Sequence, residues 1–147
     1  MEIRYQFFAN EKLLIQKFIG VISIERYMAY NRSIMQSAAL NSINKILNDF
    51  RDLVFDDNLD DFNERLDSIV EYRRKVSENI LKNFDIEILF WVDKPLPTTI
   101  AVLFSSNFSE SNCKFCTLTE DVIDMLKLPK QFSNLESIIS NLENTFK

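Results

Sequence analysis

The chain has 147 residues, 46% of them hydrophobic and 27% charged, which predicts one globular domain with a substantial core. It contains no histidine and one glycine, Gly20, which excludes imidazole chemistry and a glycine-rich phosphate loop. Its net charge of −5 is opposite in sign to that of nucleic-acid binders, so we expect no DNA or RNA partner.

The amino-terminal segment carries charge where a signal peptide needs an apolar stretch. No segment reaches the roughly 18 consecutive apolar residues of a membrane span. Cys113 and Cys116 are too few for a disulfide framework and suit a reducing compartment. The sequence therefore predicts a cytoplasmic protein with no membrane span.

The chain opens with residues 2–8 and 12–19, both rich in aromatic and β-branched side chains, and the short break between them predicts a β-hairpin. After Gly20, Ser23 is a good N-cap for a helix over about residues 23–40, whose apolar side chains follow helical spacing. A third strand is expected within residues 44–50.

Residues 58–76 show the clearest helical periodicity of the chain, with acidic residues in the first turn. Residues 86–92 are nearly continuous in apolar side chains, as in a strand buried on both faces. Pro97 is well placed for the first turn of a helix over residues 98–104.

Residues 113–116 predict a last strand, and Thr117 or Thr119 then caps a helix over residues 120–126 that Pro129 ends. Residues 133–146 predict a final amphipathic helix, with these side chains on one face: Leu135, Ile138, Ile139, Leu142 and Phe146. We expect a domain over residues 1–128, and a C-terminal helix within residues 129–147 that packs on it or on a partner.

Each strand after the hairpin is followed by a helix. This order predicts right-handed crossovers and an α/β fold, in which a mostly parallel sheet has one antiparallel edge.

Three segments occur in a characteristic order. Residues 13–20 followed by 23–27 predict a strand with a terminal glycine and the start of a helix, residues 46–51 a strand with an aspartate, and residues 115–121 a strand running into a helix. In this order they resemble the second, third and last strands of the STAS domain, and in particular of its branch of anti-sigma-factor antagonists. The resemblance covers roughly residues 1–128.

The resemblance implies regulation by protein contact, or in some members binding of a nucleotide or lipid, without catalysis. The antagonists are switched by phosphorylation of a hydroxyl residue at the start of the helix after the third strand. Residues 55–60 of this chain contain no hydroxyl residue, so we expect no such switch. Asp57 could mimic the phosphorylated state, but an acid at a helix start is also favoured for stability alone.

Other motifs fit known sites incompletely. A calcium-binding loop starting at Asp56 would have Asp61 at the position where glycine is needed. Asp56 or Asp57 could also correspond to the phosphoacceptor aspartate of a receiver domain. Receiver domains begin with a strand, a helix and a strand, however, whereas this chain begins with a hairpin. Cys113 and Cys116 form a C-x-x-C motif, but residues three apart in a strand point to opposite faces and cannot easily bridge. We therefore expect no metal, no cofactor and no redox pair.

The sequence predicts a binding domain, and not an enzyme, whose partner is another protein or a second copy. The alternative is a carrier protein that binds a small apolar or nucleotide ligand within its aromatic interior. A third class, a hydrolase that uses carboxylates alone, would need two acids that converge in a cleft. Open α/β sheets bind at the carboxyl ends of their strands. The expected contact residues are Phe55, Asp56, Asp57, Asn58, Asp93, Lys94, Pro95, Thr98 and Thr99.

Overall fold

The computed structural model describes residues 1–21, 23–54, 71, 86–95, 98, 102 and 113–147. The predicted helices over residues 58–76 and 98–104 lie largely outside this part of the chain. The described elements are β1 (Glu2–Phe8), β2 (Leu13–Val21), α1 (Ile24–Met35), η1 (Ala38–Ser42), β3 (Lys45–Asp49), β4 (Leu53–Val54), β5 (Glu87–Trp91), β6 (Cys113–Cys116), α4 (Thr119–Met125), η3 (Lys130–Phe132), α5 (Leu135–Ser140) and β7 (Asn144–Phe146).

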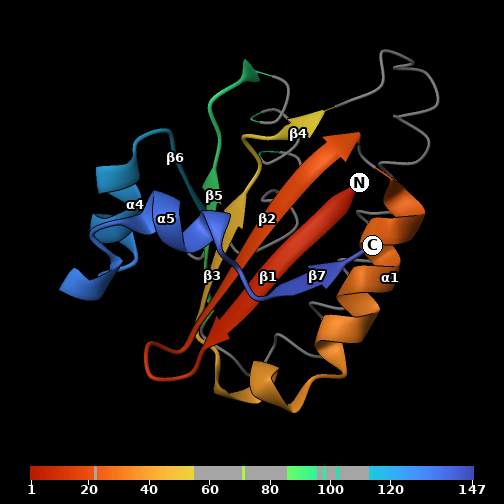
Figure 1. Ribbon diagram of the computed structural model, residues 1–147, viewed down its shortest axis with the longest axis horizontal. Coiled ribbons are helices and arrows are strands. Elements are labelled where there is room, and N and C mark those ends of the chain that lie inside the picture. The colour runs from red at the N-terminus through yellow and green to blue at the C-terminus, as the bar shows by residue number, and fades with distance from the viewer. Residues whose placement is uncertain (22, 55–70, 72–85, 96–97, 99–101, 103–112) are drawn as a thin grey trace.

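The strands form one mixed sheet in the order β6-β5-β3-β2-β1-β7, with β4 paired to the end of β2 (Figure 1). The pairs β2·β3, β3·β5 and β5·β6 are parallel, whereas β1 is antiparallel to both of its neighbours. The predicted α/β fold with a mostly parallel sheet and an N-terminal hairpin is confirmed. The antiparallel strand is not at the edge, however, because β7 pairs with its outer side.

The hairpin forms where the sequence predicts it, with Glu2 opposite Ile19 and Phe8 opposite Leu13. Lys12 closes the turn at a φ of 52° and donates its backbone N–H to Ala9 O at 3.2 Å. Gly20 adopts a φ of 81°, a conformation that a side chain would strain, and β2 continues beyond it to Val21.

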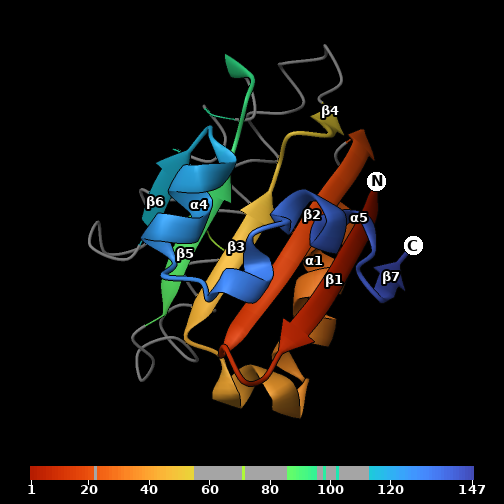
Figure 2. The same ribbon diagram turned by 60° about the vertical axis from the view of Figure 1, so that its left-hand side comes forward.

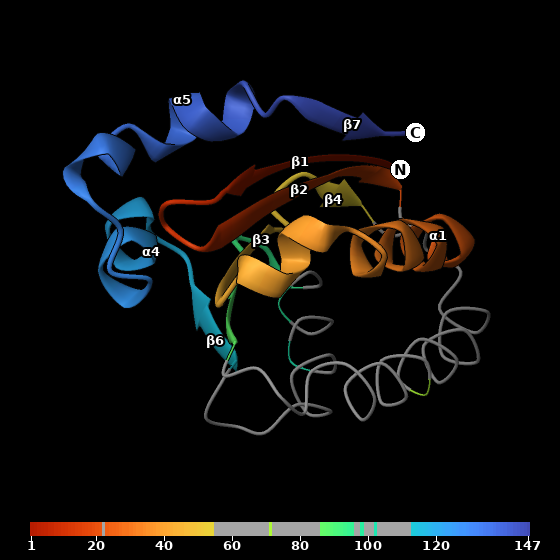
Figure 3. The same cartoon turned by 90° about the horizontal axis from the view of Figure 1, so that it is seen from below.

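Successive strand residues point to opposite faces of the sheet and build two separate cores. Leu14 lies in one core, and its neighbours Leu13 and Ile15 lie in the other. Tyr27, Tyr30 and Ile34 of α1 cover the first core. Residues of α4 and α5 cover the second core, so helices lie on both faces of the sheet (Figures 2 and 3).

Helix α1 begins where the sequence predicts it, since the Ser23 side chain accepts a hydrogen bond from Arg26 N at 3.4 Å. It ends at Met35, earlier than the predicted Leu40. Ser37 starts a separate 3₁₀ turn by accepting a hydrogen bond from Ala39 N, and this local side-chain bond competes with continuation of the helix.

The predicted threonine cap of α4 is wrong. The N-cap residue is Leu118, which makes no side-chain cap bond, and Thr119 is already the first residue of the helix. As the first residue inside the helix, Thr119 is not in the position from which a side chain caps it.

The predicted helix over residues 133–146 is also longer than the observed one. Helix α5 ends at Ser140, and Asn144–Phe146 form strand β7, which pairs with Ile3, Arg4 and Tyr5 of β1. Leu135, Ile139 and Leu142 are buried in the second core, whereas Phe146 packs against the first. The open side of β1 offers backbone hydrogen bonds to these last residues, which local periodicity does not indicate.

Candidate functional site

The parallel strands of the sheet end at one edge, which we call the carboxyl edge. The segments that follow β3 (Arg51, Asp52), β5 (Asp93, Lys94) and β6 (Thr117, Leu118) lie there, together with the ends of β2 and β4 (Figure 1). Open α/β sheets place their binding sites at this edge.

A buried carboxylate organises the centre of the carboxyl edge. Asp49, the last residue of β3, has a fully buried side chain. Its Oδ1 accepts hydrogen bonds from Arg51 N at 3.1 Å and Arg51 Nε at 2.9 Å, and its Oδ2 accepts one from Arg51 Nη2 at 2.8 Å. These bonds satisfy a charge that would be costly to bury alone, and they fix the direction of the Arg51 side chain.

The same guanidinium binds a second carboxylate, from α5. Arg51 Nη1 donates to Glu136 Oε1 at 2.6 Å and Arg51 Nη2 donates to Glu136 Oε2 at 3.1 Å. Burial alone would lower the pKa of Arg51, but the hydrogen bonds to the two acids outweigh it and raise that pKa. The hydrogen bond from Arg51 lowers the pKa of Glu136, against a smaller opposing effect of burial.

Trp91 supplies a flat surface beneath Arg51. The Arg51 Cζ atom lies 3.4 Å from the centroid of the indole ring, within the range of a cation–π contact. The indole Nε1–H donates to Thr117 O at 3.3 Å, and the Trp91 side chain is buried. Strand β5 therefore positions the guanidinium from a side that neither acid occupies.

Two lysines complete the charge pattern of this edge. Lys94 Nζ donates to the backbone oxygen of Arg51 at 2.6 Å, and Lys17 Nζ lies 2.7 Å from Asp52 Oδ2. The hydrogen bond from Lys17 lowers the pKa of Asp52, with burial acting weakly in the opposite direction. Lys17 also lowers the pKa of Glu136, so the position of the Glu136 carboxylate is favourable for negative charge.

The expected contact residues are only partly described. Phe55, Asp56, Asp57, Asn58 and Thr99 lie outside the described residues. Asp93, Lys94 and Pro95 are exposed, and Thr98 is half-buried. Its hydroxyl donates to Lys94 O at 2.7 Å. That donor is therefore already used within the chain.

Sequence reasoning missed the centre of this cluster, which is Asp49, Arg51, Trp91 and Glu136. The Asp49-x-Arg51 spacing at the end of a strand is a local signal that could have been noticed. The role of Glu136 had no such signal, because it lies 85 positions from Arg51 in the sequence.

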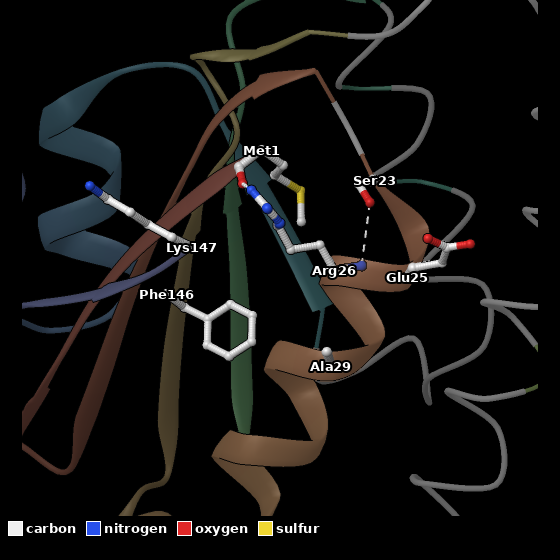
Figure 4. Close-up of a pocket in the computed structure, with 7 residues that line it drawn as sticks. All are labelled: Met1, Ser23, Glu25, Arg26, Ala29, Phe146 and Lys147. Carbon is white, nitrogen blue, oxygen red and sulfur yellow. Dashed lines mark hydrogen bonds between the residues drawn. The ribbon is translucent and has the colours of Figure 1, made fainter.

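A hollow lies beside the start of α1, between that helix and the end of β7 (Figure 4). It is open to solvent, measures about 610 Å³ and is lined by Met1, Ser23, Glu25, Arg26, Ala29, Phe146 and Lys147. Arg26 Nη1 donates to Met1 O at 2.7 Å, which ties α1 to the first residue of the chain. The described contacts of this hollow tie the chain to itself and do not indicate a ligand.

Cys113 and Cys116 form no disulfide, and they belong to different cores. The expectation that they point to opposite faces is confirmed. Burial raises the pKa of the Cys116 thiol to about 12, and a nucleophilic or redox cysteine needs the opposite shift.

Within the part of the chain that the structure describes, no three histidine, cysteine or acidic side chains form a group that could hold a metal ion. The described segments also include no helix that is long and apolar enough to cross a membrane.

The fold and the carboxyl edge define a three-layer α/β domain in which an N-terminal hairpin leads into a mostly parallel sheet. No known protein family and no curated protein matches the sequence. Among solved structures, the chain is similar to the anti-sigma-factor antagonist SpoIIAA in its unphosphorylated form. The two chains are 13% identical with a TM-score of 0.49, over 86% of this chain and 99% of that chain.

Proposed function

We propose that the protein is a regulatory domain that acts by binding another protein at the carboxyl edge of its sheet, without catalysis and without a serine phospho-switch. The resemblance of its sequence to antagonist domains implies regulation by contact. Two cysteines that form no disulfide are consistent with action in the cytoplasm.

The observation that carries this proposal is a set of exposed apolar side chains at the carboxyl edge. Val21 and Val54 face each other across β2 and β4, and each is 49% exposed. Leu118, which follows β6 and is the N-cap residue of α4, is 53% exposed. The charged residues Asp93 and Lys94 are exposed at the same edge. Exposed apolar and charged side chains together are typical of a protein interface, which combines an apolar centre with a polar rim.

The interior of the first core does not support the alternative of an apolar ligand. The rings of Phe18 and Phe50 lie 4.9 Å apart between centroids, and those of Phe50 and Phe90 lie 5.3 Å apart. Phe90 stacks on Phe115 in turn at 5.7 Å. These aromatic side chains fill the space between them, so they act as core.

The test compares the tagged protein with two double variants in affinity purification from its native cell. The edge variant carries Lys94→Glu and Leu118→Asp, at exposed positions. Asp is a favourable N-cap residue, so the second change should not weaken α4. The control variant carries Ala9→Asp and Lys12→Glu in the turn between β1 and β2, at the opposite end of the sheet.

We expect to find a protein that is captured by the natural chain and by the control variant but not by the edge variant. Purified, that protein should bind the edge variant at least about tenfold more weakly. Capture of the same proteins by all three forms would contradict the proposal.

A further inference from the structure

Arg51 binds its two carboxylates with different sides of the guanidinium. Asp49 takes the side formed by Nε and Nη2, and Glu136 takes the end formed by Nη1 and Nη2. Each contact is a planar pair of N–H···O bonds, the geometry in which arginine recognises carboxylates. The two contacts differ in solvent access, because Asp49 is fully buried and the Glu136 side chain is 53% exposed.

The orientation of Arg51 does not depend on Glu136. Asp49 holds Nε and Nη2 from within the sheet, and the Trp91 ring supports the plane of the guanidinium. If the Glu136 carboxylate left, Nη1 and Nη2 would still face the same direction. Such a preorganised donor pair binds an incoming group without a further cost of ordering the side chain.

The position of α5 does not depend on the ion pair either. Leu135 and Ile139, which flank Glu136 in the helix, are fully buried in the second core. The Glu136 carboxylate can therefore rotate into solvent while α5 stays in place. An exposed ion pair of this kind contributes little to stability, so an external carboxylate can compete with it.

We propose that the exposed end of Arg51 is a binding site for the carboxylate of an acidic side chain on a protein partner, and that Glu136 occupies it in the free protein. The proposal rests on the function proposed above and names the contact at the same edge. Arginine held in this way is a frequent anchor at the centre of protein interfaces.

The local charges favour a monoanion. With Glu136 turned away, Arg51 is balanced by Asp49, and Lys17 by Asp52. Lys94, bound to the backbone oxygen of Arg51, remains as an additional positive charge near the site. One carboxylate fits this balance, whereas a phosphate dianion would add unpaired negative charge beside the buried Asp49 and the exposed Asp52.

Trp91 makes the site measurable, because it is the one tryptophan of the chain and contacts Arg51 directly. The probe is sodium acetate, titrated against sodium chloride at equal ionic strength, with the indole N–H resonance as the signal. The test variant is Glu136→Ala, and Glu143→Ala is the matched control, since it removes the same charge from another exposed residue of the C-terminal segment.

We expect Glu136→Ala to show a saturable, acetate-specific shift at a concentration at least about tenfold lower than the natural chain and Glu143→Ala require. Adding Arg51→Lys should remove the shift while the amide spectrum stays folded, because lysine cannot offer the paired donors. A folded Glu136→Ala protein without a saturable response to acetate overturns the proposal. Saturation by inorganic phosphate at lower concentration than acetate also overturns it.

The partner found by affinity purification separates this proposal from the proposed function. Glu136→Ala should bind that partner at least about tenfold more tightly, since the internal competitor is gone. If the edge variant loses the partner but Glu136→Ala does not bind it more tightly, the carboxylate contact is overturned and the proposed function stands. If acetate binds as expected but no partner depends on the carboxyl edge, the proposed function fails.

Discussion

At the scale of single residues, the carboxyl edge depends on one buried charge. Asp49 ends a strand in which Ile46 and Leu47 contribute to the two cores. Its carboxylate is compatible with burial because Arg51 supplies three hydrogen bonds. Arg51 in turn joins β3, β5 and α5 through Asp49, Trp91 and Glu136. Removal of the Arg51 side chain should therefore destabilise more than one element.

We predict that Arg51→Ala lowers the free energy of unfolding by about 3–5 kcal/mol, because it leaves the buried Asp49 carboxylate without its partner. Urea denaturation followed by circular dichroism measures the change. Arg32→Ala, at an exposed position in the last turn of α1, serves as the control and should change stability by no more than about 0.5 kcal/mol. Equal effects of the two substitutions would contradict the role given to Arg51.

The bond between Arg51 and Glu136 should make stability depend on pH. The folded protein lowers the pKa of Glu136 below its ordinary value of 4.5. The resulting stabilisation is fully present above that value and is lost as the pH falls through the lower pKa of the folded state.

Glu136→Gln should therefore cost up to about 1 kcal/mol at pH 7, a small effect because the side chain is more than half exposed. Urea titrations of both proteins between pH 7 and the acid range check this. The difference should shrink below pH 4.5, and a difference that grows on acidification would contradict the assignment.

At the scale of elements, the C-terminal segment has two separate attachments. Helix α5 covers the second core, while β7 adds to the sheet beside β1 and places Phe146 next to Tyr30, with 5.6 Å between their ring centroids. The segment thus closes one edge of the sheet and also brings Glu136 to Arg51. Buried apolar side chains attach this C-terminal segment to the rest of the domain.

We predict that Leu135→Ala lowers the free energy of unfolding by about 2–5 kcal/mol, because the fully buried side chain leaves a cavity in the second core. The control is Ser137→Ala in the same helix, where the side chain is exposed and little change is expected. Thermal and urea unfolding of both variants provide the measurement. A small effect of Leu135→Ala would mean that α5 depends on the ion pair after all.

At the scale of the whole molecule, strands β1, β2, β3, β5 and β6 each contribute side chains to both cores, so the helices on both faces depend on one set of strands. β6 shows this at its two cysteines: Cys113 packs against the first core and Cys116 is buried in the second. Access to Cys116 therefore reports on opening of the sheet and the helices that cover it.

We predict that Cys116, observed alone in a Cys113→Ser variant, reacts with a thiol reagent only as fast as the protein opens. The thiol is buried and its pKa is raised to about 12, so little thiolate exists near neutral pH. Addition of urea below the unfolding midpoint should accelerate the reaction. The reverse variant, Cys116→Ser, should react faster in native buffer because Cys113 is only half-buried; equal rates would contradict the assigned burial.

Much of the sheet was predictable from the sequence, since the relevant signals are local. The hairpin, the strands Lys45–Asp49 and Glu87–Trp91, and the start of α1 at Ser23 all follow from alternation, apolar runs and a cap residue. The clearest error lies where distant residues compete with local preferences, because Asn144–Phe146 pair with β1 and do not extend α5. The N-cap residue of α4, Leu118, makes no side-chain cap bond, so no local capping signal marks the start of that helix.

The candidate site, too, was predictable from the sequence only in part. The expectation that contacts gather at the ends of the parallel strands rests on strand order, which the sequence indicates. The pairing of Arg51 with Glu136 and its stacking on Trp91 could not be predicted, because they join three segments far apart in the chain.

The sequence by itself determined an α/β domain with an N-terminal hairpin, without histidine chemistry or a glycine-rich phosphate loop, because composition and short-range periodicity are properties of the chain alone. Tertiary structure decided that the C-terminal residues form a strand beside β1, and that Arg51 holds one buried and one exposed carboxylate. The reason is physical. Backbone hydrogen bonds at an open sheet edge and the burial of a charge are settled only when distant segments meet in the folded protein.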